Sequence, residues 1–167
     1  MSLYFVFQGE TYKQESTGGY VWSPQLNKAG YRNAGYEKMK ELKTGDFILH
    51  NANSEIVAIS VAKTDCYEAD QPEELLNADK EMEWNIEGYR VDTEYFYFDV
   101  PLLTKNYKNW LIENYKVGSA FTVNGRGKQQ YMCDLNKEHA VFFLNEAIRL
   151  QRDERTRECL KKALENL

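Results

Sequence analysis

A tryptophan followed by serine and proline is the feature of this 167-residue chain that points most directly to chemistry. Residues 18–24 read Gly-Gly-Tyr-Val-Trp-Ser-Pro, so a large indole follows a flexible glycine pair and precedes a small hydroxyl residue. This arrangement is typical of a slot for a flat ligand, because an aromatic ring stacks on a nucleobase with about 1–3 kcal/mol per base and little need for charge. The alternative is that Trp22 only anchors the core, since aromatic side chains dominate core burial.

Other residues can complete such a slot. Trp84 lies between an acidic segment and the strand expected from residue 89, which makes it the candidate second wall, and Tyr67 is a possible third ring. Recognition of the edge of the base falls to Ser23, the neighbour of Trp22. His50 ends an expected strand, where its ring could donate to a base or a phosphate. A lone histidine is more often a structural residue with internal partners, and that interpretation stays open.

The charges are unevenly distributed. Residues 65–99 hold twelve acidic and two basic side chains, whereas residues 100–137 hold six basic and two acidic ones. A net charge of −5 argues against a protein that coats nucleic acid non-specifically, but the basic stretch 100–137 can still face phosphates. The candidate phosphate-binding residues are Lys28, Arg32, Arg126 and Lys128. An ordinary solvated mixture of charges is the alternative.

Metal, redox and membrane signals are weak. Three scattered cysteines and two histidines match neither a zinc site nor a disulfide framework, so neither a metal nor a cofactor is expected. Asp65 disfavours the thiolate of the adjacent Cys66, and no nucleophile with an orienting base is visible, so no catalytic residue is predicted. No run of about 18 apolar residues occurs and the N-terminus lacks the pattern of a signal peptide, which predicts a cytoplasmic protein without a membrane span.

Patterning predicts a mixed α+β domain over residues 1–150, with residues 151–167 as a helical extension or connector. The expected architecture is a curved or barrel-like, mixed or antiparallel sheet of five or six strands surrounded by helices. Residues 9–19 are expected to form a loop. Strands are predicted at 3–8, 20–22, 47–50, 56–62, 89–99, 121–123 and 131–135. Helices are predicted at 33–42, 72–79, 106–115 and from a cap at Asn136 onward.

In order and spacing these segments resemble the PUA-like superfamily, and within it the EVE and YTH branches, over roughly residues 4–144. Residues 19–23, Gly-Tyr-Val-Trp-Ser, are similar to the stretch that supplies one wall of the cage in YTH readers of N6-methyladenine. Residues 43–47, Lys-Thr-Gly-Asp-Phe, resemble a turn common in PUA-like folds. Residues 124–131, Asn-Gly-Arg-Gly-Lys-Gln-Gln-Tyr, are similar to a segment of the N-terminal modules of McrB-type restriction systems.

This resemblance implies a reader that flips a modified base of DNA, N6-methyladenine or a modified cytosine, into an aromatic cage. It also implies a partner nuclease or motor subunit or domain, because no nuclease or AAA+ motif occurs here. Three alternatives stay open: an RNA reader, a small hydrolase or ribonuclease of the ASCH type, and an interaction domain that dimerises through its C-terminal helices. The oligomeric state is not predicted.

Overall fold

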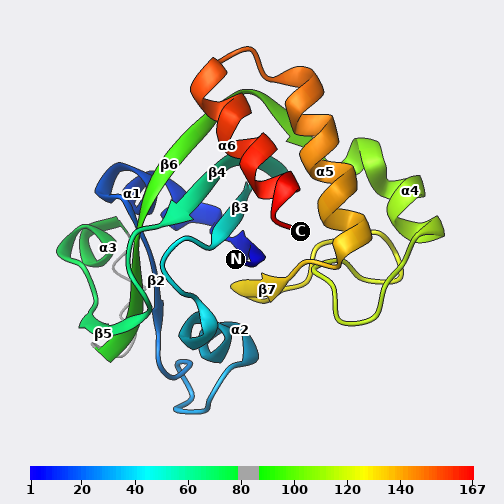
Figure 1. The fold of residues 1–167 in the computed structure, drawn as a ribbon. Coiled ribbons are helices and arrows are strands. Elements are labelled where there is room, and N and C mark those ends of the chain that lie inside the picture. The colour runs from blue at the N-terminus through cyan, green and yellow to red at the C-terminus, as the bar shows by residue number, and fades with distance from the viewer. Residues whose placement is uncertain (79–86) are drawn as a thin grey trace.

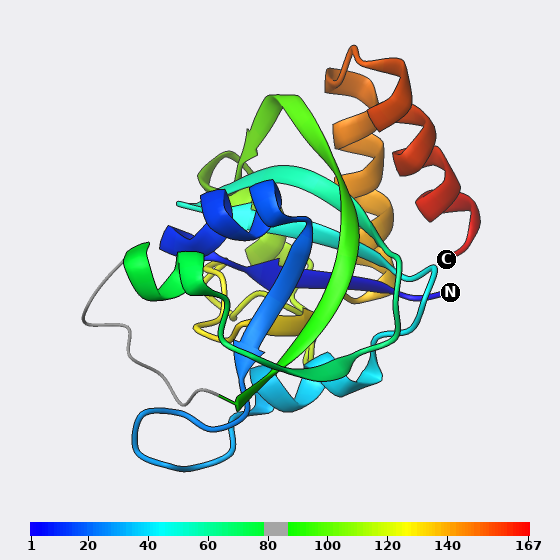
Figure 2. The same ribbon diagram turned by 90° about the vertical axis from the view of Figure 1, so that its left-hand side faces the viewer.

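A seven-stranded mixed sheet organises the structure, a computed structural model that describes residues 1–78 and 87–167. The predicted α+β architecture with a curved sheet and C-terminal helices is confirmed (Figures 1 and 2). The strands are β1 (Leu3–Phe7), β2 (Tyr20–Pro24), β3 (Phe47–Ala52), β4 (Glu55–Ala62), β5 (Tyr67–Asp70), β6 (Glu87–Leu103) and β7 (Met132–Asp134). Their order is β2-β6-β4-β3-β1-β7, with β5 paired to β6.

Short helices connect the strands, and two longer ones follow the last strand. The α-helices are α1 (Tyr12–Gly18), α2 (Ala34–Lys38), α3 (Glu73–Ala78), α4 (Lys108–Glu113), α5 (Lys137–Leu150) and α6 (Glu154–Glu165). Single 3-10 turns are η1 (Gly9–Thr11), η2 (Met39–Glu41) and η3 (Thr104–Tyr107). Among the described residues, no helix has the length and apolar character needed to cross a membrane.

The 17-residue strand β6 joins two parts of the sheet. Its first half pairs with β2 and β5, and its second half pairs with β4. Between Ile56 and Ala58 of β4, the partner in β6 jumps from Leu102 to Tyr97, which marks a bulge. Before the bulge, the alternation expected over 89–99 is retained: Tyr89 and Val91 belong to one hydrophobic cluster, whereas Phe96 and Phe98 pack in another on the opposite face of the sheet.

Alternate residues of β1 enter two hydrophobic clusters on opposite faces of the sheet. Phe5 belongs to the larger cluster, which α5 and α6 cover, as Figure 1 shows. Val6 belongs to the smaller one, together with Ile48 and Met39. This period of two is what a strand buried on both faces requires.

Three segments differ from the sequence-based expectation. Residues 9–19 were expected to be a loop but contain η1 and α1. Residues 121–123 form no strand, only an isolated bridge from Phe121 to Gly127. The short strand β5 was not expected.

The C-terminal residues fold back as a separate helix. Leu160 of α6 is fully buried in the larger cluster. Gln151, between the two helices, accepts from the backbone N–H of Val100 at 3.0 Å and donates to its carbonyl at 2.7 Å. The two ends of the chain lie close together (Figures 1 and 2).

Candidate nucleic-acid interface

A cavity of about 340 Å³ lies beside Trp22, between β1, β2 and the segment that precedes β7. We call it the Trp22 pocket. Among the residues that the structure describes, no acidic residue lines it. The lining residues are Phe7, Gln8, Thr11, Trp22, Ser23, Pro24, Asn33, Tyr36, Leu75, Gln129, Gln130 and Tyr131. Its volume lies in the range of about 300–1,000 Å³ typical of small-ligand sites.

The sheet holds the Trp22 side chain in one place. Trp22 pairs with Arg90 of β6, and its indole lies against Gly88, where an added Cβ would come within 2.3 Å of the ring. The indole Nε1 donates to the carbonyl of Ala69 in β5 at 3.0 Å. Only 2% of the residue is exposed, and it clusters with Leu75. Trp22 is therefore both a core residue and a fixed wall of the pocket.

A buried carboxyl stands behind this wall. Glu15 of α1 accepts from the backbone N–H of Trp22 at 2.9 Å and from the hydroxyl of Tyr131. Its other oxygen accepts from Thr11 Oγ1 at 2.8 Å and from Gln8 Nε2 at 3.1 Å. All four donor residues line the Trp22 pocket. Burial raises the pKa of Glu15 to about 7, and the four hydrogen bonds oppose that rise.

His50 extends the same network inward. Gln8 Nε2 donates to Glu15 and to Tyr95 Oη, so Gln8 Oε1 accepts from His50 Nδ1–H at 2.7 Å. His50 Nε2 must then accept from the Ser60 hydroxyl, at 2.6 Å. Burial lowers the pKa of His50 to about 3, which keeps the ring neutral.

The structure does not support the expected contact between His50 and a ligand. The ring is fully buried, both nitrogens have internal partners, and His50 lines neither the Trp22 pocket nor the larger cavity described next. The structural interpretation of this histidine is the one that fits.

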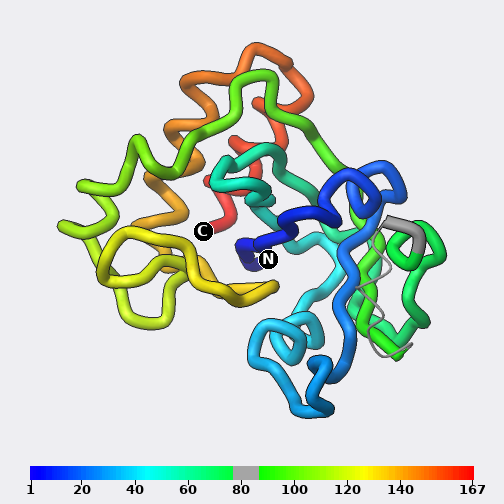
Figure 3. Tube along the Cα trace, turned by 180° about the vertical axis from the view of Figure 1, so that it is seen from behind, coloured from blue at the N-terminus to red at the C-terminus, as the bar shows by residue number. Residues whose placement is uncertain are grey.

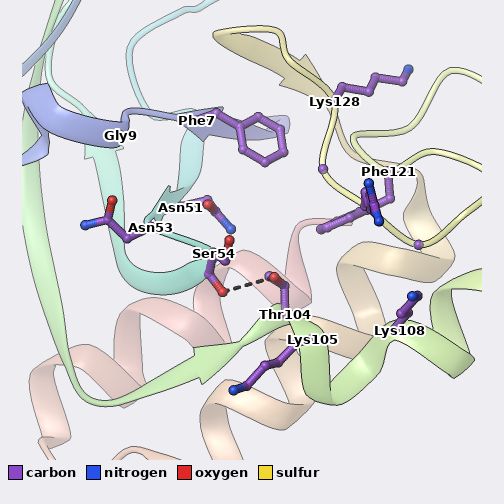
Figure 4. Close-up of a pocket in the computed structure, with 13 residues that line it drawn as sticks. Phe7, Gly9, Asn51, Asn53, Ser54, Thr104, Lys105, Lys108, Phe121 and Lys128 are labelled. Carbon is purple, nitrogen blue, oxygen red and sulfur yellow. Dashed lines mark hydrogen bonds between the residues drawn. The ribbon is translucent and has the colours of Figure 1, made fainter.

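A second, larger cavity of about 540 Å³ adjoins the first. We call it the basic hollow; Figure 4 shows it between the β3–β4 turn, the segment leading into α4 and the loop before β7. Within residues 1–78 and 87–167, its lining contains four cationic and no acidic side chains. The lining residues are Phe7, Gly9, Asn51, Asn53, Ser54, Thr104, Lys105, Lys108, Phe121, Gly125, Arg126, Gly127 and Lys128. Phe7 lines both cavities.

Two glycines allow the loop that carries Arg126 and Lys128 to pack against the hollow. Gly125 has φ +71°, and an added Cβ would lie 2.8 Å from the carbonyl of Lys108. At Gly127 an added Cβ would lie 2.5 Å from the ring of Phe7. The loop runs past the end of β1, as Figure 3 shows, and the N–H of Phe7 donates to the carbonyl of Tyr131 at 2.8 Å. Only glycine permits this close approach.

Two of the predicted phosphate-binding residues, Arg126 and Lys128, thus come together with Lys105 and Lys108, which sequence reasoning did not select. None of the four forms an ion pair with any residue that the structure describes. The sequence feature that could have pointed to Lys105 and Lys108 is their position in the basic stretch 100–137. The Trp22 pocket likewise contains side chains that were not selected, namely the ring of Tyr36, the aliphatic group of Leu75 and the amide of Gln129.

The remaining predicted residues lie apart. Ser23 lines the Trp22 pocket, is 1% exposed, and its hydroxyl donates to the carbonyl of Pro24 at 3.1 Å. Tyr67 lies outside both cavities, and its hydroxyl donates to Asp92 at 2.8 Å. Trp84 lies outside the described residues.

Lys28 and Arg32 lie on the loop that leaves the Trp22 pocket at Pro24 and returns at Asn33. Both are exposed, and neither lines the pocket or the hollow.

The three cysteines are free thiols. Burial raises the pKa of Cys66 to about 11, which disfavours its thiolate at neutral pH. Within residues 1–78 and 87–167, no group of three or more histidine, cysteine, aspartate or glutamate side chains is arranged to hold a metal ion.

Comparison with known proteins identifies the fold. No protein-family model and no curated protein matches the sequence. Among solved structures, the Pho92 YTH domain in complex with m6A is similar, with 10% identity, coverage of 87% of this chain and 84% of that chain, and a TM-score of 0.54. The ASCH protein from Zymomonas mobilis has 8% identity, coverage of 91% and 97%, and a TM-score of 0.54.

The N-terminal domain of Staphylothermus marinus McrB aligns over 88% of this chain and 92% of that chain, with 15% identity and a TM-score of 0.49. The chain has a PUA-like fold of the EVE and YTH type, so the predicted resemblance in fold is confirmed. At these identities the likeness concerns the fold alone.

Proposed function

We propose that this chain is a non-catalytic reader of modified nucleobases, which takes one flipped base of DNA into the Trp22 pocket. The observation that carries the proposal is the shared wall at Phe7, which joins a ligand-sized pocket to a hollow that, among the described residues, is lined by four cations and no carboxylate. A base needs the first kind of site and its backbone phosphates need the second.

The pocket offers both surfaces that a modified base requires. Trp22, Tyr36 and Leu75 supply apolar contact for the ring and an added methyl group. The side-chain oxygen of Asn33 already accepts from the N–H of Gly35 at 2.9 Å, which leaves its amide N–H groups to donate to a ligand. The exposed amide of Gln129 can approach the same edge.

A single methyl group contributes only about 0.8 kcal/mol through burial. Stronger discrimination comes from hydrogen bonds at a desolvated base edge, because a mismatched donor or acceptor is left unpaired there. Flipping the base out of a duplex costs a few kcal/mol. Phosphate contacts from the basic hollow, and from Lys28 and Arg32 on the loop next to the pocket, would offset this cost.

The ligand class is N6-methyladenine or a modified cytosine, and the proposed role is to direct a partner nuclease or motor subunit. The similarity in fold to a YTH domain that was solved with m6A supports the first of these bases. The resemblance of residues 124–131 to McrB-type modules supports DNA and a restriction partner. RNA is the alternative polymer, since an unpaired base of either polymer can stack on an aromatic wall.

Binding to matched oligonucleotides tests the proposal. We expect fluorescence anisotropy to show about tenfold tighter binding to a strand with one modified base than to the plain strand, together with quenching of tryptophan emission. Trp22→Phe preserves a ring in the core and should lose most of the preference. Trp110→Phe is the matched control, because Trp110 stacks on Phe142 outside both cavities. Equal affinity for plain and modified DNA and RNA would contradict the proposal.

One observation favours an enzyme of the ASCH type as the second candidate. Glu15 has a pKa of about 7, which suits a general base, and it lies directly behind the Trp22 pocket. Incubation with labelled RNA and DNA discriminates between the two functions. Turnover that Glu15→Gln abolishes would support the enzyme, whereas binding without turnover supports the reader.

A further inference from the structure

The basic hollow is too large for a phosphate contact alone. Its volume of about 540 Å³ exceeds the 340 Å³ of the Trp22 pocket, which we assign to a whole base. Besides its cations, it contains two aromatic rings, Phe7 and Phe121, whose centroids lie 6.5 Å apart. Rings, amides and cations together are what a nucleotide needs, whereas an inorganic anion needs only the cations.

We propose that the basic hollow binds a second nucleotide of the same strand, directly next to the base in the Trp22 pocket. This inference rests on the proposed function and adds to it that the reader recognises a dinucleotide. Adjacent chain positions line opposite cavities: Gln8 lines the pocket and Gly9 the hollow, Gln129 the pocket and Lys128 the hollow. Phe7 stands at the boundary, so the two bases would be splayed apart around its ring.

The β3–β4 turn presents polar groups to this second base. Asn53 and Ser54 have φ values of +52° and +63°, and both residues are exposed. Thr104 Oγ1 donates to the carbonyl of Ser54 at 3.0 Å, which fixes the turn against η3 (Figure 4). The amide of Asn53 can both donate and accept, so it matches the edge of a base.

The cations stand on two sides of the hollow. Figure 4 shows Lys105 on η3, Lys108 at the start of α4, and Lys128 across the hollow on the loop before β7. A nucleotide within a strand has a phosphate on each side of its sugar. Cations on both sides of the cavity therefore suit an internal nucleotide better than a single terminal phosphate.

The test uses single-stranded pentanucleotides with the preferred modified base at the centre. In two further strands, an abasic residue replaces the neighbouring base on the 5′ or the 3′ side, which removes one base and keeps every phosphate. We expect one of the two replacements to weaken binding about tenfold and the other to have little effect. Equal affinity of all three strands would overturn the second-nucleotide site.

Variants assign the effect to the hollow. Asn53→Gly retains the positive φ of the turn but removes the side-chain contact with the neighbouring base. In this variant, the abasic replacement that weakens binding to the wild type should therefore weaken binding less. Lys105→Gln with Lys108→Gln should reduce the salt dependence of binding, by a slope of about 0.7 for each phosphate contact in single strands. Lys63→Gln with Lys161→Gln is the charge-matched control, since both lysines are exposed and line neither cavity.

The free modified nucleoside separates this inference from the proposed function. It has no phosphate and no neighbour, so it tests the Trp22 pocket alone and should be insensitive to the hollow variants. If the nucleoside binds but the abasic strands and the variants show no effect, the second site is wrong and the reader stands. If the nucleoside does not bind, the reader and the second site are both wrong.

Discussion

Glu15 accepts a hydrogen bond from the backbone N–H of Trp22 at 2.9 Å, although Glu15 is fully buried and belongs to a different element. This bond joins α1 to β2 at the wall of the Trp22 pocket. The same carboxyl holds Tyr131 and Thr11, so a single group positions three sides of one cavity. The consequences of this arrangement for stability and binding can be measured.

Glu15 and His50 should act on stability with opposite pH dependence. The pKa of Glu15 is raised from 4.5 to about 7, so its contribution is present below pH 4.5 and is lost as the pH rises through 7. The pKa of His50 is lowered from 6.5 to about 3, so its contribution is present above pH 6.5 and is lost as the pH falls toward 3. Between pH 4.5 and 6.5 the two groups therefore change the free energy of unfolding by equal and opposite amounts per pH unit.

Glu15→Gln should reveal the pH dependence of stability that comes from His50 alone. We expect the free energy of unfolding of this variant, relative to the wild type, to rise by about 1.4 kcal/mol per pH unit between pH 4.5 and 6.5. Urea unfolding at several pH values measures this difference. A constant difference across the range would show that the pKa of Glu15 is not raised in the folded protein.

His50→Leu should destabilise the fold without changing recognition. The substitution leaves Gln8 Oε1 and the Ser60 hydroxyl without their partner, which costs about 1–3 kcal/mol for each unsatisfied group. Affinity for the modified strand, measured where the variant is fully folded, should stay within about twofold of the wild type. If the variant lost affinity for the modified strand but not for the plain strand, His50 would have to be a ligand contact.

Gly88→Ala should disturb the Trp22 wall. The new Cβ would lie 2.3 Å from the indole, so overpacking should cost about 1–3 kcal/mol of stability and weaken ligand binding. Combining it with Trp22→Phe should recover part of the lost stability, because the smaller ring leaves room. Additive effects in this double-mutant cycle would argue against a direct clash.

Arg126→Gln with Lys128→Gln should lower the salt dependence of DNA binding. We expect the slope of log K against log salt to fall by about 1 to 2 units, while the preference for the modified base is retained. Lys28→Gln with Arg32→Gln tests the other pair in the same titration. An unchanged slope for either pair would remove it from the phosphate contacts.

Leu160→Ala tests whether α6 belongs to the domain. Its side chain is fully buried in the larger cluster, so truncation should cost about 2–5 kcal/mol. A cost below 1 kcal/mol, measured by thermal or urea unfolding, would support the alternative that residues 151–167 are a connector.

Local chemistry made much of the fold readable from the sequence. Asn33 and Asn136 were expected as helix caps, and each side chain accepts a backbone N–H at 2.9 Å. The hairpin from β3 to β4 follows from two apolar segments on either side of the polar turn at Asn53 and Ser54. Each of these features depends on neighbours within a few residues, and such short-range preferences are written directly in the order of the residues.

The site was only partly predictable. Trp22 and Ser23 could be selected because the segment 18–24 combines a turn with a ring. The inclusion of Lys105 and Lys108 could not be predicted, since the polarity of a side chain does not reveal which cavity it reaches. For His50 the sequence left two interpretations open, a ligand contact and a structural residue, and the burial of the ring favours the second. Glu15 gave no signal at all, because a glutamate in a polar stretch is normally solvated.

By itself, then, the sequence determined most of the strands, the caps and the ring beside the pocket, all of which depend on local preferences. Only the tertiary structure decided that α1 turns Glu15 inward, that β6 bulges opposite β4, and that Phe7 separates two cavities. The physical reason is that burial and strand register are set by pairing between residues far apart in the chain, and no local pattern records that pairing.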